Sequence, residues 1–278
     1  MTRIKRIFAN NQFAFIRCIR GYSRSIMKLH KVNKSAKDYF TFVNMKNTFN
    51  YKHIFIDLDK TIWDFESNTN LTFREIFEKH DLITRGITDM TLFHKVYSGI
   101  NDMLWGLYRE NKIKKEILNI KRFELTLNEF GIDDLILATQ IAEDYVTLSP
   151  QKTILFPHSH EALSYLQSKY SLHIITNGFE ELQQQKLDNC GLRKYFKTIT
   201  TSEEAGVKKP ETRIFKLALQ KAAAKIEESL MIGDDLEVDV AGAKGIGMDT
   251  LYFNPENIAH QDDPDHEVHS WLEVMKIL

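Results

Sequence analysis

The stretch YKHIFIDLDKTIWDF, from Tyr51 to Phe65, joins an apolar run directly to two aspartates spaced two residues apart. The apolar run, residues 54–56, is typical of a strand that is buried on both faces. Carboxylates at the end of such a strand are costly unless water solvates them or they bind a positive group. The stretch therefore indicates either a plain polar turn or a ligand site.

The composition of the chain is that of a globular protein. Its 278 residues are 43% hydrophobic and 27% charged, which leaves room for a large core and a second domain. The net charge of -1 argues against a protein that binds nucleic acid through overall basicity. Cys18 and Cys190 have no metal-ligand spacing, so neither a disulfide framework nor a zinc site is expected. We expect a cytoplasmic protein.

Residues 1–48 differ from the rest of the chain in charge. They contain eleven lysines and arginines but one acid, Asp38, and no apolar run long enough for a membrane span or a secretory signal. Such a segment is typical of an organelle transit peptide, of a disordered tail, or of a start codon assigned too early, with Met27 or Met45 as the first residue. We expect this basic extension to lie outside the fold, and without it the chain is distinctly acidic.

From Tyr51 onwards, strand-like runs alternate with amphipathic, helix-like stretches. The expected strands are residues 54–56, 171–177, 198–202, 230–235 and 249–254. Helical patterns between them include residues 159–170 and 212–226. This alternation predicts an α/β fold with a doubly wound parallel sheet and helices on both of its faces. In such a sheet the ligand site lies beyond the carboxyl ends of the strands.

Polar residues follow several of the expected strands, as a site at this edge requires. They are Asp57 and Asp59 after the first strand, Thr176 and Asn177 after the second, Lys208 and Lys209 after the third, and Asp234, Asp235 and Asp239 after the fourth. Carboxylates, a hydroxyl and a lysine at one edge suit a divalent cation together with a phosphate. Magnesium prefers hard oxygen ligands, and the cation and the lysine offset the negative charges.

The same residues carry a family resemblance. DLDKT (57–61), ITNG (175–178), KKP (208–210) and GDDLEVD (233–239) resemble, in order, four motifs of the haloacid dehalogenase superfamily of phosphohydrolases. The resemblance covers Tyr51 to the C-terminus and implies a Rossmann-like core. In the family pattern the lysine directly precedes the proline, which favours Lys209 over Lys208. The aspartate directly follows the glycine, which favours Asp234 over Asp235.

Chemistry and the resemblance together assign roles to these residues. Asp57 is expected to attack phosphorus and form an aspartyl-phosphate. Asp59 is expected to be the general acid for the leaving oxygen and then the base for water. We expect Thr176 and Lys209 to hold the phosphoryl oxygens, with Asn177 as a further substrate contact.

The resemblance also implies a set of magnesium ligands. Asp57 and Asp234 would give carboxylates to Mg²⁺, and Asp59 would give its backbone carbonyl. Asp239 is expected to orient metal-bound water or Lys209 rather than to bind the ion itself.

Residues 65–155 contain several helical segments and no convincing strand. Such an insert after the first strand resembles the C1 cap of the superfamily, a helical lid that closes over the nucleophile and excludes water. We therefore expect a core domain from residues 49–64 and 156–278 and a cap domain from residues 65–155. In the cap, Trp105 and Tyr108 are candidates to stack on a nucleobase, although packing between helices explains them equally well. Arg122 is a candidate for the base edge or the phosphate.

Three further segments point to a subfamily. Residues 101–111, 176–192 and 202–215 resemble the noncanonical pyrimidine 5'-nucleotidases, which remove phosphate from UMP, dUMP, dTMP and related nucleotides. One position departs from the pattern, because Pro157 is usually followed by glycine and here precedes His158. That departure puts the local turn in doubt, not the chemistry.

Other activities fit the same catalytic residues. A phosphatase acting on phosphoglycolate or a sugar phosphate, and a sugar-phosphate mutase, both remain open, whereas a 2-haloacid dehalogenase would need neither magnesium nor Asp59. The expected partner is a small phosphate monoester, with no nucleic-acid polymer and no membrane. We expect a monomer or a weak homodimer.

Overall fold

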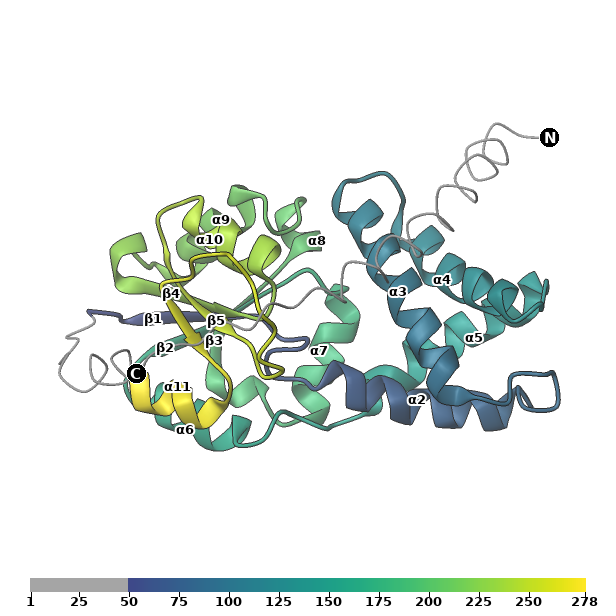
Figure 1. Cartoon of the computed structure of the whole chain (residues 1–278). Coiled ribbons are helices and arrows are strands. Elements are labelled where there is room, and N and C mark those ends of the chain that lie inside the picture. The colour runs from purple at the N-terminus through teal and green to yellow at the C-terminus, as the bar shows by residue number, and fades with distance from the viewer. Residues whose placement is uncertain (1–49) are drawn as a thin grey trace. The chain divides into compact units, whose positions relative to one another are not determined.

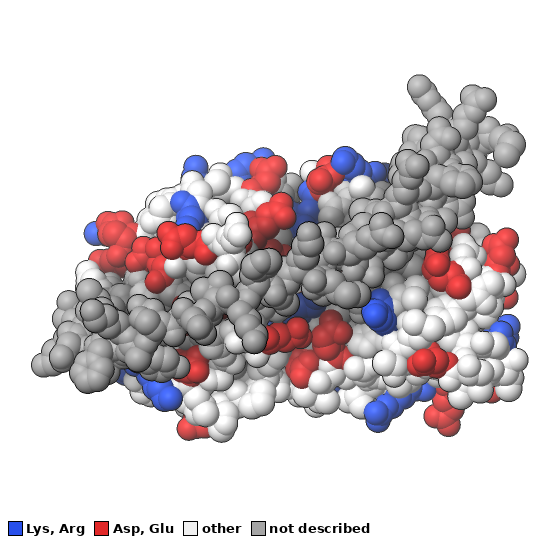
Figure 2. Space-filling model, viewed as in Figure 1, with Lys and Arg blue, Asp and Glu red and all other residues white. Residues whose placement is uncertain are grey.

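The computed structural model describes residues 50–278 (Figure 1). The basic extension expected at residues 1–48 lies outside the described residues. Within the described part, no helix is both long and apolar enough to cross a membrane. Figure 2 shows many Asp and Glu side chains on the visible face, with Lys and Arg between them, in line with the acidic balance of this part of the chain.

The centre of the fold is a six-stranded parallel sheet. Its strands are β1 (His53–Ile56), β2 (Ser171–Thr176), β3 (Phe196–Thr201), β4 (Ser229–Gly233), β5 (Asp249–Phe253) and β6 (His266–Val268), in the spatial order β3-β2-β1-β4-β5-β6. Ile56 pairs with Ile174 on one side and with Ile232 on the other. The direction of winding reverses between β1 and β4, and a ligand crevice forms at such a switch point. The predicted fold class is confirmed.

Helices cover both faces of the sheet (Figure 1). The long helices are α6 (Ser159–Gln167), α7 (Glu180–Asn189) and α9 (Thr212–Ala222), and the shorter ones are α8 (Ser202–Ala205), α10 (Ala241–Lys244) and α11 (Trp271–Ile277). Single helical turns are η2 (Ser149–Gln151), η3 (Arg193–Tyr195), η4 (Ile226–Glu228) and η5 (Leu236–Val240). Ile54 and Ile56 pack in one apolar cluster with Trp271, while Phe55 packs in another with Phe215. This alternation is why residues 54–56 of β1 are all apolar.

Four helices between β1 and β2 have an apolar core of their own. They are α2 (Phe65–Lys79), α3 (Met90–Arg109), α4 (Lys115–Glu129) and α5 (Leu135–Leu148), and we call residues 65–155 the helical insert. Phe73, Phe93, Tyr97, Phe123 and Tyr145 are among the buried residues of its core. Three of the helices begin at an aspartate, Asp64, Asp89 or Asp134, whose side chain accepts a hydrogen bond from the N–H three residues on. Such caps satisfy an otherwise unpaired N–H at the start of each helix.

The chain re-enters the core through the turn at Pro157 and His158. His158 has a φ of 65° and directly precedes α6. This left-handed conformation favours glycine, because a side chain bearing Cβ is strained there. The departure seen in the sequence is therefore accommodated by a strained histidine.

Candidate active site

The polar strand ends meet in one pocket of about 180 Å³ at the carboxyl edge of the sheet. The core lines it with Asp57, Asp59, Thr176, Asn177, Lys209 and Asp234, among others. Helix α3 of the insert contributes Asn101, Asp102, Trp105 and Arg109. The convergence predicted from the sequence is thus present, with one wall supplied by the insert.

Lys209 lies at the centre of the site and is 2% exposed. Its Nζ donates to Asp57 Oδ1 at 2.5 Å, to Asp239 Oδ1 at 2.6 Å and to the carbonyl oxygen of Ile175 at 3.0 Å. Burial alone would lower the pKa of Lys209, but the carboxylates of Asp239 and Asp57 outweigh it and raise the pKa above its ordinary value. The side chain is therefore a fixed cation whose three hydrogens are all directed.

Asn177 holds the backbone of that lysine. Its Oδ1 accepts from the Lys209 N–H at 2.8 Å, and its Nδ2 donates to the Lys209 carbonyl at 3.0 Å. Asn177 lines the pocket, as a substrate contact must. Its polar atoms, however, are directed at Lys209, which favours a role in placing the lysine.

Three carboxylates form a cluster suited to a cation. Oxygens of Asp57, Asp234 and Asp239 lie within 4.8 Å of one another. Burial and the charge of Asp239 raise the pKa of Asp234 to about 7, against a hydrogen bond from Thr61. Burial likewise raises the pKa of Asp57 well above its ordinary range, although Lys209 opposes the shift. One ammonium does not offset three negative charges, and clustered carboxylate oxygens fit a hard divalent ion.

The loop after β1 is braced by two residues from later in the chain, Asp234 and Trp271. Thr61 is fully buried, and its Oγ1 donates to Asp234 Oδ1 at 3.0 Å. Trp271, in the last helix, donates from Nε1 to the Thr61 carbonyl oxygen at 3.0 Å. The Thr61 hydroxyl thus links the loop that follows Asp57 and Asp59 to the end of β4. The Thr61 carbonyl oxygen links the same loop to α11.

The structure separates Asp234 from its neighbour Asp235. The Asp235 carboxylate caps η5, because its Oδ1 accepts from the N–H groups of Glu237 and Val238, both at 3.0 Å. Asp234 instead faces the carboxylate cluster. Gly233 makes room for this arrangement, since a Cβ there would lie 2.4 Å from the Asp239 carboxyl group. The preference for Asp234 drawn from the sequence agrees with this geometry.

Asp59 is held by two residues that sequence reasoning missed. Its Oδ1 accepts from Lys186 Nζ at 2.5 Å, and its Oδ2 accepts from Gln183 Nε2 at 2.8 Å. Both donors come from α7, three residues apart and therefore on one face of the helix. The available signal was the string QQQK (183–186), which begins seven residues after Thr176, the last residue of its strand.

The aromatic candidates of the insert, Trp105 and Tyr108, differ in whether they line the pocket. Trp105 lines the pocket and stacks on Phe179, with ring centroids 5.3 Å apart and an interplanar angle of 26°. Tyr108 packs edge-on against both rings and is 7% exposed. Within residues 50–278, the pocket lining includes Trp105 and Arg109 but neither Tyr108 nor Arg122.

Arg122 is buried inside the insert. Its Nη1 donates to the Tyr97 hydroxyl at 3.1 Å and to Asn101 Oδ1 at 3.3 Å, and its guanidinium carbon lies 4.7 Å from the Tyr145 ring centroid. It therefore contacts the pocket through Asn101, which lines it. Arg109 at the end of α3 was not singled out, since nothing in the sequence distinguishes it from the other arginines of the chain.

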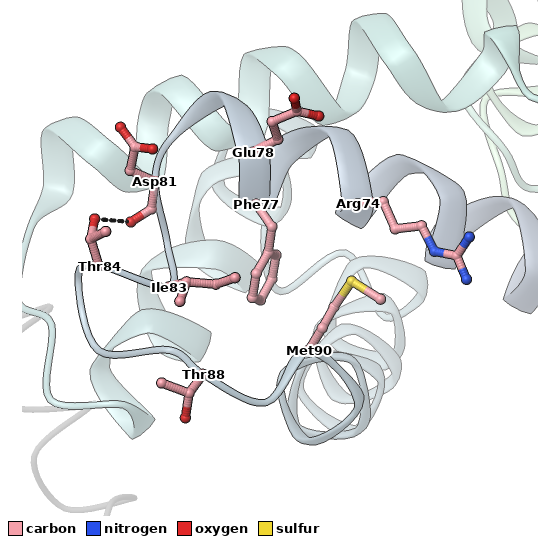
Figure 3. Close-up of a pocket in the computed structure, with 8 residues that line it drawn as sticks. All are labelled: Arg74, Phe77, Glu78, Asp81, Ile83, Thr84, Thr88 and Met90. Carbon is pink, nitrogen blue, oxygen red and sulfur yellow. Dashed lines mark hydrogen bonds between the residues drawn. The ribbon is translucent and has the colours of Figure 1, made fainter.

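A larger pocket, of about 560 Å³, lies within the insert, between the end of α2 and the start of α3 (Figure 3). Phe77, Ile83 and Met90 form its apolar lining, and Thr84 Oγ1 donates to the Asp81 carbonyl oxygen at 2.7 Å. None of the eight residues that line it comes from a strand end. The smaller pocket at the sheet edge is the one that contains the buried cation of Lys209 and the carboxylate cluster.

Comparison with known proteins decides the family. A family model described as a haloacid dehalogenase-like hydrolase matches residues 51–247. The chain belongs to this family. The predicted superfamily is thereby confirmed, and so is the prediction of a hydrolase.

Two curated relatives of this chain are named pyrimidine 5'-nucleotidases. PynA of Streptococcus pneumoniae is 28% identical over 232 residues, which are 82% of this chain and 95% of that protein. YjjG of Escherichia coli is 29% identical over 219 residues, 78% of this chain and 91% of that protein. A solved structure of the YfnB hydrolase from Bacillus subtilis, described as bound to magnesium, matches with a TM-score of 0.74 and 28% identity, covering 82% of this chain and 98% of that one.

Proposed function

We propose that this protein removes phosphate from pyrimidine nucleoside monophosphates, with UMP, dUMP and dTMP as the preferred substrates. Its enzyme class is that of a phosphoric monoester hydrolase, in agreement with its family and its relatives. The observation that carries the proposal is the Asp57 carboxylate, buried at a strand end and 2.5 Å from the ammonium of Lys209. That pair presents a nucleophile beside a fixed cation that can bind a phosphoryl oxygen.

The first half of the reaction transfers the phosphoryl group to the enzyme. A carboxylate oxygen of Asp57 forms a bond to phosphorus while the bond from phosphorus to the ester oxygen breaks. Asp59 gives a proton to that oxygen, which leaves as the alcohol. Lys209 and the hydroxyl of Thr176 hold the phosphoryl oxygens while charge develops on them.

The second half releases phosphate. Asp59, now a carboxylate, takes a proton from water, whose oxygen attacks phosphorus as the bond to Asp57 breaks. Inorganic phosphate leaves, Asp57 is again a carboxylate, and Asp59 again carries the proton needed for the next substrate. Every atom and proton is accounted for by substrate, water and these two aspartates.

The carboxylate cluster supports a magnesium site within this proposal. Asp57 and Asp234 would hold Mg²⁺, together with the backbone carbonyl of Asp59. When bound, the ion offsets the charge of the carboxylates and the phosphate. Asp239 is 2.6 Å from Lys209 Nζ, which favours a role in holding the lysine rather than the metal.

The insert supports the choice of a nucleotide. Trp105 gives the pocket a flat aromatic wall on which a base can stack, and Arg109 adds donors that suit the carbonyl oxygens of uracil and thymine. Two groups of contacts tie the insert to the core: Lys115 pairs with Glu181 and Glu203, and Lys208 donates to Asn111. We propose that residues 65–155 form a cap domain that closes over the core domain of residues 49–64 and 156–278 through these contacts.

A substrate panel tests the proposal. Phosphate release with magnesium is measured for UMP, dUMP, dTMP, CMP, AMP, GMP, phosphoglycolate and several sugar phosphates. Preference for the uracil and thymine nucleotides is expected. A flat profile, or a preference for phosphoglycolate or sugar phosphates, would overturn the nucleotide assignment and leave the phosphomonoesterase. No release from any ester would overturn both.

A further inference from the structure

Helix α7 reaches into the site with two buried polar side chains, Gln183 and Lys186, whose contacts are with the reacting groups of the proposed mechanism. We propose that these two are positioning residues: together they fix the carboxylate of Asp59, and Gln183 also sets the hydroxyl of Thr176 as a donor to the phosphate. The inference rests on the roles proposed above for Asp59 and Thr176.

Lys186 has one charged partner among the described contacts and an aromatic floor. Its Nζ lies 2.5 Å from Asp59 Oδ1 and 4.0 Å from the centroid of the Trp63 ring. The side chain is 8% exposed, and lysine is rarely buried to this extent unless it is paired. The face of the Trp63 ring attracts the ammonium of Lys186 from one side, and the carboxylate of Asp59 attracts it from the other. Lys186 is thereby fixed, and it fixes Asp59 Oδ1 in turn.

Gln183 joins the two groups through a single nitrogen. Its side chain is fully buried, and Nε2 lies 2.8 Å from Asp59 Oδ2 and 2.8 Å from Thr176 Oγ1. An amide nitrogen has two hydrogens, one for each contact. Within residues 50–278 the buried Oε1 of Gln183 has no hydrogen-bond partner, which is unfavourable. The orientation of the amide therefore serves its nitrogen.

The hydroxyl of Thr176 is left with one direction in which to act. Its Oγ1 accepts from Gln183 Nε2 at 2.8 Å and from the Gly178 N–H at 3.1 Å. A hydroxyl oxygen has two lone pairs and one hydrogen. With both lone pairs engaged, the hydrogen remains to be donated, and Thr176 lines the pocket where the phosphoryl group is proposed to bind.

Gly178 is the residue that permits this arrangement. A Cβ at Gly178 would lie 1.9 Å from Gln183 Nε2 and 2.4 Å from the side-chain carbonyl carbon. Those distances are far below van der Waals contact, so any larger residue would displace the amide. The glycine of the ITNG motif thus leaves the space in which Gln183 of α7 reaches the end of β2.

Two substrates separate positioning of Asp59 from general damage. UMP has a sugar alkoxide as its leaving group, which needs a proton, whereas p-nitrophenyl phosphate releases a stable phenolate that does not. For Lys186→Met we expect the single-turnover rate of phosphoryl transfer to the enzyme, measured as release of the alcohol, to fall by about 10- to 100-fold with UMP and by less than about threefold with p-nitrophenyl phosphate. Asp59→Asn should show the same split between substrates.

A double-mutant cycle adds the deciding measurement. Because Lys186 acts through Asp59, the variant that combines Lys186→Met with Asp59→Asn should be no slower on UMP than Asp59→Asn alone. Gln183→Met should slow both substrates and raise KM for both, since Thr176 holds the phosphate of each. Gln185→Met and Lys197→Met are matched controls at exposed positions and should leave both rates unchanged.

The outcomes are distinguishable. Equal losses of Lys186→Met on both substrates, or additive losses in the cycle, would overturn the inference while an active wild-type enzyme sustains the proposed function. If circular dichroism shows that Lys186→Met does not fold, the same cycle is run with Lys186→Gln, which also removes the ammonium beside Asp59. A wild-type enzyme that is inactive on every phosphomonoester would overturn both proposals.

Discussion

The sheet edge and the helical insert both bury a long cationic side chain, but they surround it differently. At the edge, Lys209 contacts two carboxylates and a carbonyl oxygen. In the insert, Arg122 contacts neutral hydroxyl and amide oxygens and lies over aromatic rings. A buried charge therefore does not by itself mark a reacting group. The partners of the charge indicate its role. Carboxylates beside the ammonium of Lys209 suit a reacting site, whereas the aromatic rings around Arg122 suit a packing role.

Replacement of Asp57, the proposed nucleophile at the sheet edge, should give the largest effect. Asp57→Asn is expected to lower phosphate release by at least about a thousandfold, because the amide cannot form the aspartyl-phosphate. The unfolding transition should stay cooperative. Asp134→Asn, a matched change at a helix cap of the insert, should leave turnover per folded molecule unchanged. Substantial turnover by Asp57→Asn would remove Asp57 as the nucleophile.

Metal removal should also act on the edge and spare the insert. Chelation with EDTA is expected to stop phosphate release, and added magnesium to restore it, since the carboxylate cluster then loses and regains its cation. Magnesium at about 100 times its dissociation constant should stabilise the fold by about 2.7 kcal/mol. Phosphate release that persists in EDTA would contradict the magnesium proposal.

The two arginines of the insert give the sharpest contrast on that side. Arg122→Met should lower the free energy of unfolding by about 2–3 kcal/mol, because cation–π contacts are lost and buried oxygens lose a donor. Turnover per folded molecule should change little. Arg109→Met should change stability by no more than about 0.5 kcal/mol and raise KM for UMP by about tenfold. Urea unfolding and steady-state kinetics measure both, and the reverse pattern would restore Arg122 as a substrate contact.

A buried histidine within the sheet offers a case that belongs to neither region. Burial and the neighbouring His53 lower the pKa of His173 from 6.5 to about 4. Between these values the unfolded chain binds the proton more tightly, so stability falls as pH drops from about 6.5 towards 4, by about 1–3 kcal/mol. His173→Phe keeps a ring against Phe55 and should remove this part of the pH dependence. Identical pH profiles of unfolding in the two proteins would contradict it.

The smallest effect is expected where the chain leaves the insert. His158→Gly should stabilise the protein by about 0.5–1 kcal/mol, because glycine adopts the left-handed conformation without strain. The same change two residues later, His160→Gly, lies inside α6 and should destabilise by about 1 kcal/mol. Thermal unfolding compares the pair. Equal signs would mean that the turn is not strained.

The strand-end residues were predictable because topology places them. Parallel strands end at one edge, so Asp57, Thr176 and Asp234 had to converge once the alternation of strands and helices was recognised. Lys186 and Arg109 were not predictable in this way. Whether a long side chain on a helix reaches the site depends on the rotation of that helix against its neighbours, which tertiary packing sets. Trp105 and Tyr108 show the same limit, since residues three apart on one helix differ in whether they line the pocket.

The hydrogen bond from Trp271 to the Thr61 carbonyl oxygen makes the support of an early loop depend on a residue that is synthesised about 210 positions later. All the residues proposed to take part in the chemistry are translated well before Trp271, yet the loop that follows Asp57 obtains this brace only when α11 has emerged and packed. A message shortened by a few codons before position 271 would encode every reacting group and still lack the support of that loop.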